Sequence, residues 1–548
     1  MANKKLFKSA PSSPAKIQPA PVANTTNAAG GKAYKMSDKH ALAQLAATGC
    51  FGSTFYIDET AQLETVKKLV QNVEPEFIAK VAVYSRQKGF MKDMPAFLAA
   101  TLASKDVSLL KKVFSKVIDD GKMLRNFVQV IRSGVTGRKS LGSVPKKLIN
   151  KWINSTKDEA LFRASVGNDP SLADVIKMTH PSPDNDRRAA LYGYLTGKEA
   201  AGPGKPAIEE KRSASGKPIT IHRYNAENLP DCIKQFEAFK KNPKGTPPNV
   251  EFRLLTSLDL SRDQWVEIAK NASWHMARMN LNTFQRHGVF EVPGMDTLIA
   301  NKLADAETVA KVKVFPYQLL AAYLNTENVP VKVTNALQDA MEHATKNIPA
   351  IDGKVFVFPD VSGSMGCPIT GARGVPSKVL CNQVAALVAA SLVRKNPETE
   401  VIPFGSQTFK VKLNPRDSVM TNATMLAQLP GGGTNCSLPL AELNARGAKG
   451  DLVIYVSDNE SWMDSRGGYW SYRGTGTMEE WNKFKARNPN AKLVCIDLTP
   501  NTSMQAVDRE DILNIGGFSD NVFEVISEFA KAGLGRHWTD VIEGIKLD

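Results

Sequence analysis

The sequence lacks any long run of apolar residues. No stretch of its 548 residues approaches the roughly 18 consecutive apolar positions that a membrane-spanning helix needs. The Lys-rich N-terminus runs into Pro, Ser and Asn without the apolar core of a secretory signal. We therefore expect no membrane span and no secretion, and we predict a cytoplasmic protein.

Cysteine is scarce, and no two cysteines form a CxxC pair of the kind found in zinc and redox sites. The absence of a secretory signal favours reduced thiols over disulfides. We expect each cysteine to be a small buried hydrophobe. The six are Cys50, Cys232, Cys367, Cys381, Cys436 and Cys495.

Acidic residues are few in the first two-thirds of the chain. The whole sequence carries 70 Lys plus Arg against 55 Asp plus Glu, a net charge of +15. Residues 351–548 hold 20 basic and 22 acidic residues, so residues 1–350 carry 50 against 33, or +17. A basic part beside a near-neutral part suggests that only the first binds a polyanion.

The hydrophobic pattern divides the chain into three parts. Residues 1–36 are rich in Lys, Pro, Ala and Asn and are predicted to form a flexible basic tail. Over residues 37–349 apolar residues recur at helical spacing between short loops, which predicts an all-α region of irregular helical repeats. Two longer loops are expected within it, at 198–218 and 241–249. With 42% hydrophobic residues, the chain can bury sizeable cores.

Residues 350–548 show a different pattern. Apolar runs at 354–360, 400–404, 451–457 and 492–498 read as strands, and amphipathic stretches alternate with them. Strands that are apolar throughout are typical of a parallel sheet covered on both faces. We predict a doubly wound α/β domain, whose ligands bind beyond the carboxyl ends of the strands.

Oxygen-bearing side chains follow these strands. Asp360, Ser362 and Ser364 come directly after the first, Thr434 lies in a glycine-rich loop, and Asp458 ends the strand DLVIYV. Alone, the DxSxS run is more typical of an Asx turn or a helix cap than of a metal site. Together, two carboxylates and three hydroxyls from three loops predict a site for a hard divalent cation, Mg²⁺ or Mn²⁺, and not for zinc.

The most concentrated basic segment is 121–157, which has nine positive charges in 37 residues and no Asp or Glu. A merely solvated surface normally mixes both signs. Phosphate binding is therefore expected, without the signature of a base-reading module, and hence recognition of RNA shape, backbone and single-stranded ends. The candidate RNA-binding residues here are Arg132, Arg138, Lys139, Lys146, Lys147 and Lys151.

Several stretches make the chain resemble the Ro ribonucleoprotein family, in which a TROVE domain precedes a von Willebrand factor A-like domain. They are AVYSRQKGFMKDMPAFLAA (82–100), ADVIKMTHPSP, MARMNLNTFQRHGV, DVSGSMG, GGGTNCSLPL and VSDNESW. All five positions of the metal-ion-dependent adhesion site of that α/β domain are occupied here.

The resemblance implies that HEAT-like repeats form a monomeric ring and that the protein is not an enzyme. It implies Y-type noncoding RNA on an outer basic surface that includes Arg163, Lys177 and His180, and 3′ ends of misfolded RNA in the hole, near Arg278. His180 precedes a proline and fits a helix cap as well, and Arg278 fits an ordinary helix surface. The α/β domain is the expected docking site for a protein partner such as an exoribonuclease.

The leading hypothesis is thus an RNA-binding protein for noncoding-RNA quality control or stabilisation. Two alternatives stay open at this point. One is a Mg²⁺-dependent RNA-processing nuclease that uses Asp360 and Asp458, although no general base accompanies them. The other is a protein-adhesion scaffold that does not bind RNA.

Overall fold

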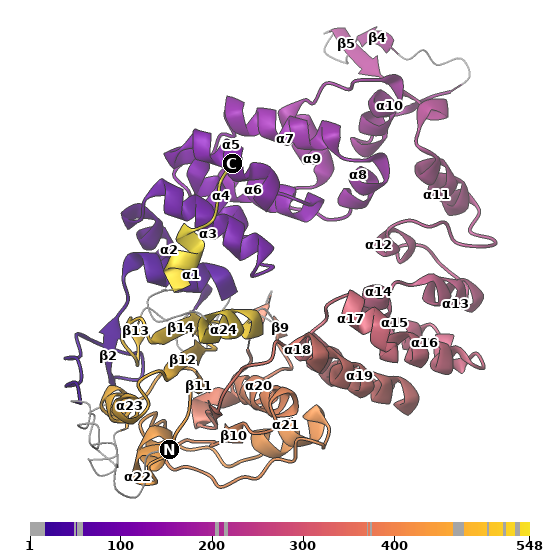
Figure 1. The fold of residues 1–548 in the computed structure, drawn as a ribbon. Helices are drawn as coiled ribbons and strands as arrows, with labels where there is room; N and C mark the ends of the chain where they lie inside the picture. Colours follow the sequence, from indigo (N-terminus) through magenta and orange to yellow (C-terminus); the bar gives the residue numbers. More distant parts are fainter. Residues whose placement is uncertain are drawn as a thin grey trace, which may run out of the picture.

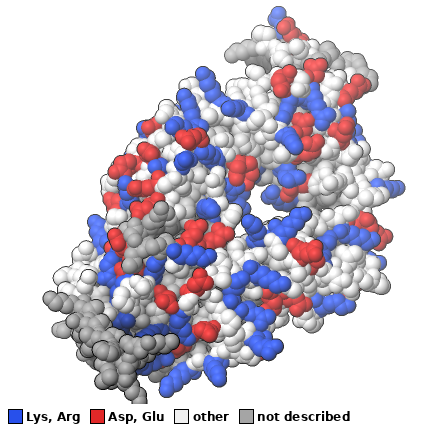
Figure 2. Space-filling view, in the orientation of Figure 1, with Lys and Arg blue, Asp and Glu red and all other residues white. Residues whose placement is uncertain are grey.

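A computed structural model describes residues 17–48, 51, 58–202, 208–212, 218–369, 371–372, 375–463, 476–500, 503–518, 522–531 and 538–548. An arc of helices leads into a parallel sheet that is flanked by helices, and together they enclose a central opening (Figures 1 and 2). The predicted fold class, an all-α helical-repeat ring followed by a doubly wound α/β domain, is confirmed.

The arc contains short helices joined by short loops. They are α1 (Asp38–Thr48), α2 (Glu59–Asn72), α3 (Pro75–Gln87), α4 (Asp93–Lys105), α5 (Val107–Val117), α6 (Gly121–Ser133), α7 (Ser143–Ser155), α8 (Asp158–Ala164), α9 (Leu172–Thr179), α10 (Asp186–Leu195), α11 (Asp231–Lys241), α12 (Phe252–Leu255), α13 (Arg262–Asn271), α14 (Trp274–Met279), α15 (Leu281–Arg286), α16 (Met295–Ala304), α17 (Ala306–Lys311), α18 (Pro316–Leu324) and α19 (Val331–Ala344).

Capping residues set the ends of the basic helices. The side chain of Asp120 accepts a hydrogen bond from the amide of Met123 at 2.7 Å and starts α6. Gly134 ends this helix in the left-handed conformation, with φ of 83°, which glycine adopts without steric cost. Ser171 and Asp174 form a capping box at the start of α9.

Packing between alternate helices builds the arc. α4 packs on α6, α5 on α7, α6 on α8 and α7 on α9, in addition to contacts between neighbours such as α3 and α4. A helix that contacts its second neighbour belongs to one of two stacked layers, which is the arrangement of helical repeats. The apolar faces of these helices join one continuous core.

The α/β domain has a five-stranded sheet in the order β10-β7-β11-β12-β14, with every pair parallel. The strands are β7 (Val355–Pro359), β10 (Glu400–Val401), β11 (Leu452–Ser457), β12 (Lys492–Asp497) and β14 (Ile512–Gly516). The helices that accompany them are α20 (Cys381–Lys395), α21 (Val419–Ala427), α22 (Leu438–Ala445), α23 (Gly476–Arg487), α24 (Val522–Lys531) and α25 (Trp538–Glu543).

Successive residues of the central strands enter different cores. Val357 and Ile454 belong to the core shared with the helical arc, whereas Phe358 and Tyr455 belong to a second core that contains Trp481. Both faces of the sheet are therefore buried, which is why the strands are apolar throughout. Ligand access is left to the strand ends.

The α/β domain contacts both ends of the arc. At one end α1 packs on β14 and α25 packs on α3, and His40 lies 2.9 Å from Asp508. At the other end α18 and α19 pack on α20 and α21, and Glu342 accepts a hydrogen bond from the amide of Val419 at 2.6 Å. One chain thus closes the ring (Figure 1).

The N-terminal segment differs from the predicted tail. Residues 1–16 lie outside the described residues, but 17–36 pack on the α/β domain. Strands β1 (Thr25–Thr26) and β2 (Lys32–Lys35) form a sheet with β13 (Ser503–Met504). Tyr34 is buried in the second core. The flexible-tail prediction is wrong for this stretch because the strand partner that orders it lies some 470 positions away in the sequence.

The predicted loop at 198–218 also contains regular structure. Strands β4 (Ile208–Arg212) and β5 (Pro218–His222) form an antiparallel hairpin, and β3 (Ala200–Ala201) pairs with β6 (Tyr224–Asn225). No helix in the described ranges is long and apolar enough to cross a membrane.

Candidate functional site

Three strand-end loops converge at the carboxyl edge of the sheet. Because β7 and β11 are parallel neighbours, Asp360 and Asp458 follow adjacent strands. The loop that contains Thr434 joins them, since the amide of Gly363 donates to the carbonyl of Gly432 at 2.9 Å and that of Trp462 to Thr434 at 3.3 Å. The structure therefore brings the predicted loops together.

Asp360 is held in one orientation. One carboxylate oxygen accepts a hydrogen bond from the amide of Ser362 at 2.7 Å, and the other accepts one from the hydroxyl of Ser457 at 2.5 Å. The hydroxyl oxygens of Ser362 and Ser364 lie 3.4 Å apart. Ser457 was not among the predicted residues, although its place at the end of β11, directly before Asp458, could have indicated it.

Asp458 has one satisfied and one orphaned oxygen. Oδ1 accepts a hydrogen bond from the amide of Glu460 at 3.2 Å. Oδ2 is buried and has no hydrogen-bond partner in the described part of the chain. A buried carboxylate oxygen without a partner costs free energy, and a bound cation would remove that cost.

Burial dominates the electrostatics of the two carboxyl groups. Asp360 and Asp458 are 0% and 1% exposed. Burial, with a further contribution from the charge of Asp458, raises the pKa of Asp360 to about 7. Burial also raises the pKa of Asp458, although the hydrogen bond from the amide of Glu460 opposes it.

The donor set fits a hard cation. Asp360, Ser362, Ser364, Thr434 and Asp458 offer carboxylate and hydroxyl oxygens, the ligands that Mg²⁺ and Mn²⁺ prefer. Within the described ranges no group of three or more His, Cys, Asp and Glu side chains is placed to hold a metal ion. This set contains only two carboxylates, and its remaining donors are hydroxyls.

The N-terminal segment supports the loop that follows Asp458. The side-chain amide of Asn27 donates to the carbonyl of Ser461 at 2.9 Å, and the backbone amide of Ala29 donates to the carboxylate of Glu460 at 3.2 Å. A Cβ on Gly31 would lie 2.0 Å from the carbonyl oxygen of Ser461. Sequence reasoning missed this contact because no local pattern marks it.

A second group of predicted residues gathers where α6, α7 and α9 meet. The guanidinium of Arg132, at the end of α6, contacts the sulfur of Met178 on α9 at 3.0 Å. On α7 the amide of Asn150 donates to the carbonyl of Thr179 at 3.0 Å. Both α6 and α7 pack on α9, and the exposed cations of these three helices form what we call the basic surface: Arg132, Lys147, Lys151 and Lys177, with the exposed His180 at the end of α9.

Arg138 has an internal role. Its guanidinium donates hydrogen bonds to the carbonyls of Ala103 at 2.7 Å, Ser140 at 2.8 Å and Leu141 at 2.9 Å. These bonds hold the loop between α6 and α7 against α4. The neighbouring Lys139 is exposed, whereas Lys146 is half-buried on α7.

His180 ends α9 as its C-cap. Its φ of 51° lies in the left-handed region, and its amide donates to the carbonyl of Ile176 at 2.9 Å. The side chain is exposed. The cap interpretation is therefore confirmed for the backbone, and the exposed ring is still available to a ligand.

Arg163 is exposed and lies 3.6 Å from Glu251.

Arg278 is not part of the basic surface. It lies on α14 in the other half of the arc, where its guanidinium donates to the carbonyl of Gln318 at 2.7 Å and lies 5.8 Å from the ring centroid of Trp274. These contacts connect α14 to α18. Figure 2 shows Lys and Arg side chains gathered at the rim of the central opening.

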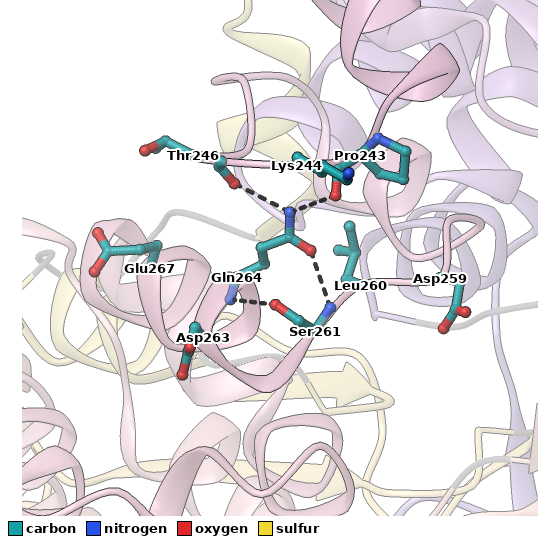
Figure 3. A pocket seen from close by; sticks show the side chains of 10 residues that line it. Pro243, Lys244, Thr246, Asp259, Leu260, Ser261, Asp263, Gln264 and Glu267 are labelled. Carbon is teal, nitrogen blue, oxygen red and sulfur yellow. Dashed lines mark hydrogen bonds between the residues drawn. The ribbon is translucent and has the colours of Figure 1, made fainter.

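One pocket of the helical arc carries a net negative charge, in contrast to the basic surface. It has a volume of about 650 Å³, and its lining includes three acidic residues, Asp259, Asp263 and Glu267, and one basic residue, Lys244. Figure 3 shows the side chain of Gln264 across it, donating to the carbonyls of Pro243 and Gly245, each at 3.0 Å. The three carboxylates make this pocket unsuited to a polyanion.

Comparisons with known proteins agree with this architecture. The family model of the Ro60 vWA domain matches residues 354–530. The RNA-binding protein RO60 of Deinococcus radiodurans is 22% identical over 552 residues, which span 92% of this chain and 95% of the relative. The crystal structure of the Deinococcus radiodurans RO (RSR) protein superposes with a TM-score of 0.62 at 19% identity, covering 90% of this chain and 99% of that one.

Proposed function

We propose that this chain, which belongs to the Ro family, is a nonenzymatic RNA-binding protein. The observation that carries the proposal is the basic surface, the exposed cations of the packed helices α6, α7 and α9: Arg132, Lys147, Lys151 and Lys177. Exposed cations bind phosphates at little desolvation cost, and they give affinity that falls steeply with salt. The curated relative that spans nearly the whole chain is itself named as an RNA-binding protein.

Two regions of the ring, its basic surface and its central opening, are proposed to bind two kinds of RNA. The basic surface favours a small structured noncoding RNA of the Y type, because its cations are spread over three helices and fit a folded backbone better than one strand. The opening through the ring, with its Lys and Arg side chains, favours single-stranded 3′ ends of misfolded RNA. The two together suit RNA quality control or stabilisation.

The α/β domain is proposed to hold Mg²⁺ or a similar divalent cation. Asp360 and Asp458 would supply charge, and Ser362, Ser364 and Thr434 would supply neutral oxygens. A cation bound there would offer an electrophilic centre to a carboxylate of a protein partner. The buried orphaned oxygen of Asp458 supports this proposal.

A gel-shift titration tests RNA binding. Lys147→Glu with Lys151→Glu reverses two exposed charges one turn apart on α7. We expect affinity for a structured noncoding RNA to fall by about 100-fold at moderate salt, and the slope of log affinity against log salt to fall by about 2. The matched control is Lys410→Glu with Lys412→Glu, two exposed lysines of the α/β domain, which should leave both quantities within twofold.

If the α7 variant and the α/β-domain control variant lost RNA affinity equally, the placement of the RNA interface on the basic surface would be contradicted. Affinity that is absent, or that does not change with salt, would contradict RNA binding as a whole. Labelled RNA is also incubated with the protein and Mg²⁺ and then recovered to see whether it is intact. Cleavage by the unmodified protein that is lost in Asp360→Ala would establish the nuclease alternative.

A further inference from the structure

Two cysteines lie together beside the turn that follows β7. Cys367 comes directly after the short helix η4 (Gly363–Gly366), and Cys381 is the first residue of α20. Their sulfur atoms are 3.5 Å apart. They are separated by 14 positions in the sequence, so their spacing does not resemble a CxxC pair.

Backbone hydrogen bonds already hold the segments that contain the two cysteines side by side. The amide of Cys381 donates to the carbonyl of Cys367 at 2.9 Å, and Pro368 and Leu380 form an antiparallel bridge. The amide of Cys367 in turn donates to the carbonyl of Ser364 at 3.1 Å. The pair therefore connects the turn at 362–366 to the start of α20.

Exposure distinguishes Cys367 from the buried thiols of the α/β domain. Cys367 is half-buried, so a small oxidant can reach it, whereas Cys436 and Cys495 are each 0% exposed. Cys232 is also half-buried but lies on α11 in the helical arc. Among the cysteines that the structure describes, Cys367 combines partial exposure with a neighbouring sulfur, that of Cys381, which is itself 0% exposed.

We propose that Cys367 and Cys381 form a reversible disulfide in response to a peroxide oxidant. The Cys367 thiolate attacks one peroxide oxygen, the O–O bond breaks, and a sulfenic acid and hydroxide form. The Cys381 sulfur then attacks the sulfenic sulfur and displaces hydroxide. The two thiol protons convert both hydroxides to water, so two thiols and one hydrogen peroxide give one disulfide and two waters.

The movement required is small. A disulfide bond is about 2.05 Å long, so the sulfurs must approach by about 1.5 Å, which side-chain rotation can supply. The crosslink would restrain the turn that contains Ser362 and Ser364 from its C-terminal side. This restraint needs neither RNA nor a metal ion, and the proposal stands apart from the function proposed above.

Peptide mapping of the full chain tests the bond. The protein, free of divalent cations and RNA, is treated with hydrogen peroxide, and unreacted thiols are alkylated before digestion. We expect a linked peptide pair that contains Cys367 and Cys381 and has lost two hydrogens, and we expect dithiothreitol to reverse it. Cys232→Ser should form the link, and Cys367→Ser and Cys381→Ser should not.

Hydrogen exchange of the same samples tests the restraint. The amides of residues 365–367 and 369 should exchange at least threefold more slowly in oxidised protein than in reduced protein, and Cys367→Ser should show no such difference. Sulfenic or sulfinic acid at Cys367 without the link would overturn the proposal. So would a link that leaves exchange in this turn unchanged.

Discussion

The basic surface and the carboxylate site treat charge in opposite ways. Lys147, Lys151 and Lys177 are exposed, so water solvates their charges at little cost. Asp360 and Asp458 are almost completely buried, so ionising them costs free energy unless a cation is close. The first region can attract a polyanion over a distance, whereas the second can bind only a ligand that enters it.

Two neighbouring residues of the basic segment 121–157 show a similar contrast between a charge held by the protein and a charge open to solvent. Arg138 and Lys139 are adjacent and equally charged, but the guanidinium of Arg138 is occupied by three carbonyls and Lys139 is exposed. In a basic run, therefore, the hydrogen-bond donors of some residues serve the fold, and those of others face solvent.

The largest effect is expected for Asp360→Ala. Without this carboxylate the site loses half of its negative charge, so Mg²⁺ should no longer raise the melting temperature. RNA affinity should stay within twofold, because the basic surface lies on other elements. Differential scanning calorimetry with and without Mg²⁺ measures the first quantity, and Asp352→Ala, an exposed residue before β7, is the control. An unchanged Mg²⁺ response would contradict the metal site.

Arg138→Ala and Lys139→Ala should separate the roles of two neighbours. The first removes three hydrogen bonds from a charged donor and should lower the free energy of unfolding by about 3 kcal/mol. The second should change it by less than about 0.5 kcal/mol. Urea denaturation measures both. Similar losses of stability in the two variants would contradict the internal role of Arg138.

In the metal-free protein, Asp360 should contribute a loss of stability as the pH rises from about 4 to about 7, seen as the difference from Asp360→Asn. Burial raises the pKa of Asp360 to about 7, so the folded state keeps a proton that the unfolded state releases across this range. The stabilising effect of Mg²⁺ should increase over the same range, because the bound form needs ionised carboxylates. Melting temperatures in buffers with a chelator, compared with Mg²⁺, check both trends. Asp360→Asn should flatten them.

The smallest effect is expected for His180→Gly. Glycine adopts the left-handed backbone without the cost that a side chain incurs, so unfolding free energy should rise by up to about 1 kcal/mol. If the exposed ring contacts phosphate, RNA affinity should fall by about threefold or less. Calorimetry and gel shift on one preparation separate the two effects, and His180→Asn, which tolerates this backbone, is the comparison variant.

The sequence allowed the carboxylate site to be predicted because its geometry follows from a topological rule. Asp360 and Asp458 each end an apolar run, and parallel neighbouring strands place such ends at one edge. Nothing in the sequence, however, shows that Oδ2 of Asp458 has no hydrogen-bond partner in the described structure. That property depends on side chains that come from distant loops.

The remaining features depend on contacts between distant segments. Arg138 meets the carbonyl of Ala103, 35 positions earlier, and Asn27 meets Ser461, 434 positions later. Charge and periodicity describe a residue's own neighbourhood, so they could not show that Arg138 is anchored or that residues 17–36 are ordered. Lys147 and Lys151, which the charge pattern indicated as RNA-binding residues, are exposed, and their contact with RNA stays a prediction.

Because one chain closes the ring, closure should not depend on the protein concentration. The contacts that close it, such as His40 with Asp508 and Glu342 with Val419, are all intramolecular. Their effective concentration is fixed by the length of the chain, not by the amount of protein. A ring assembled from separate subunits would open on dilution, whereas the aperture of this one should keep the same dimensions at nanomolar and micromolar concentrations.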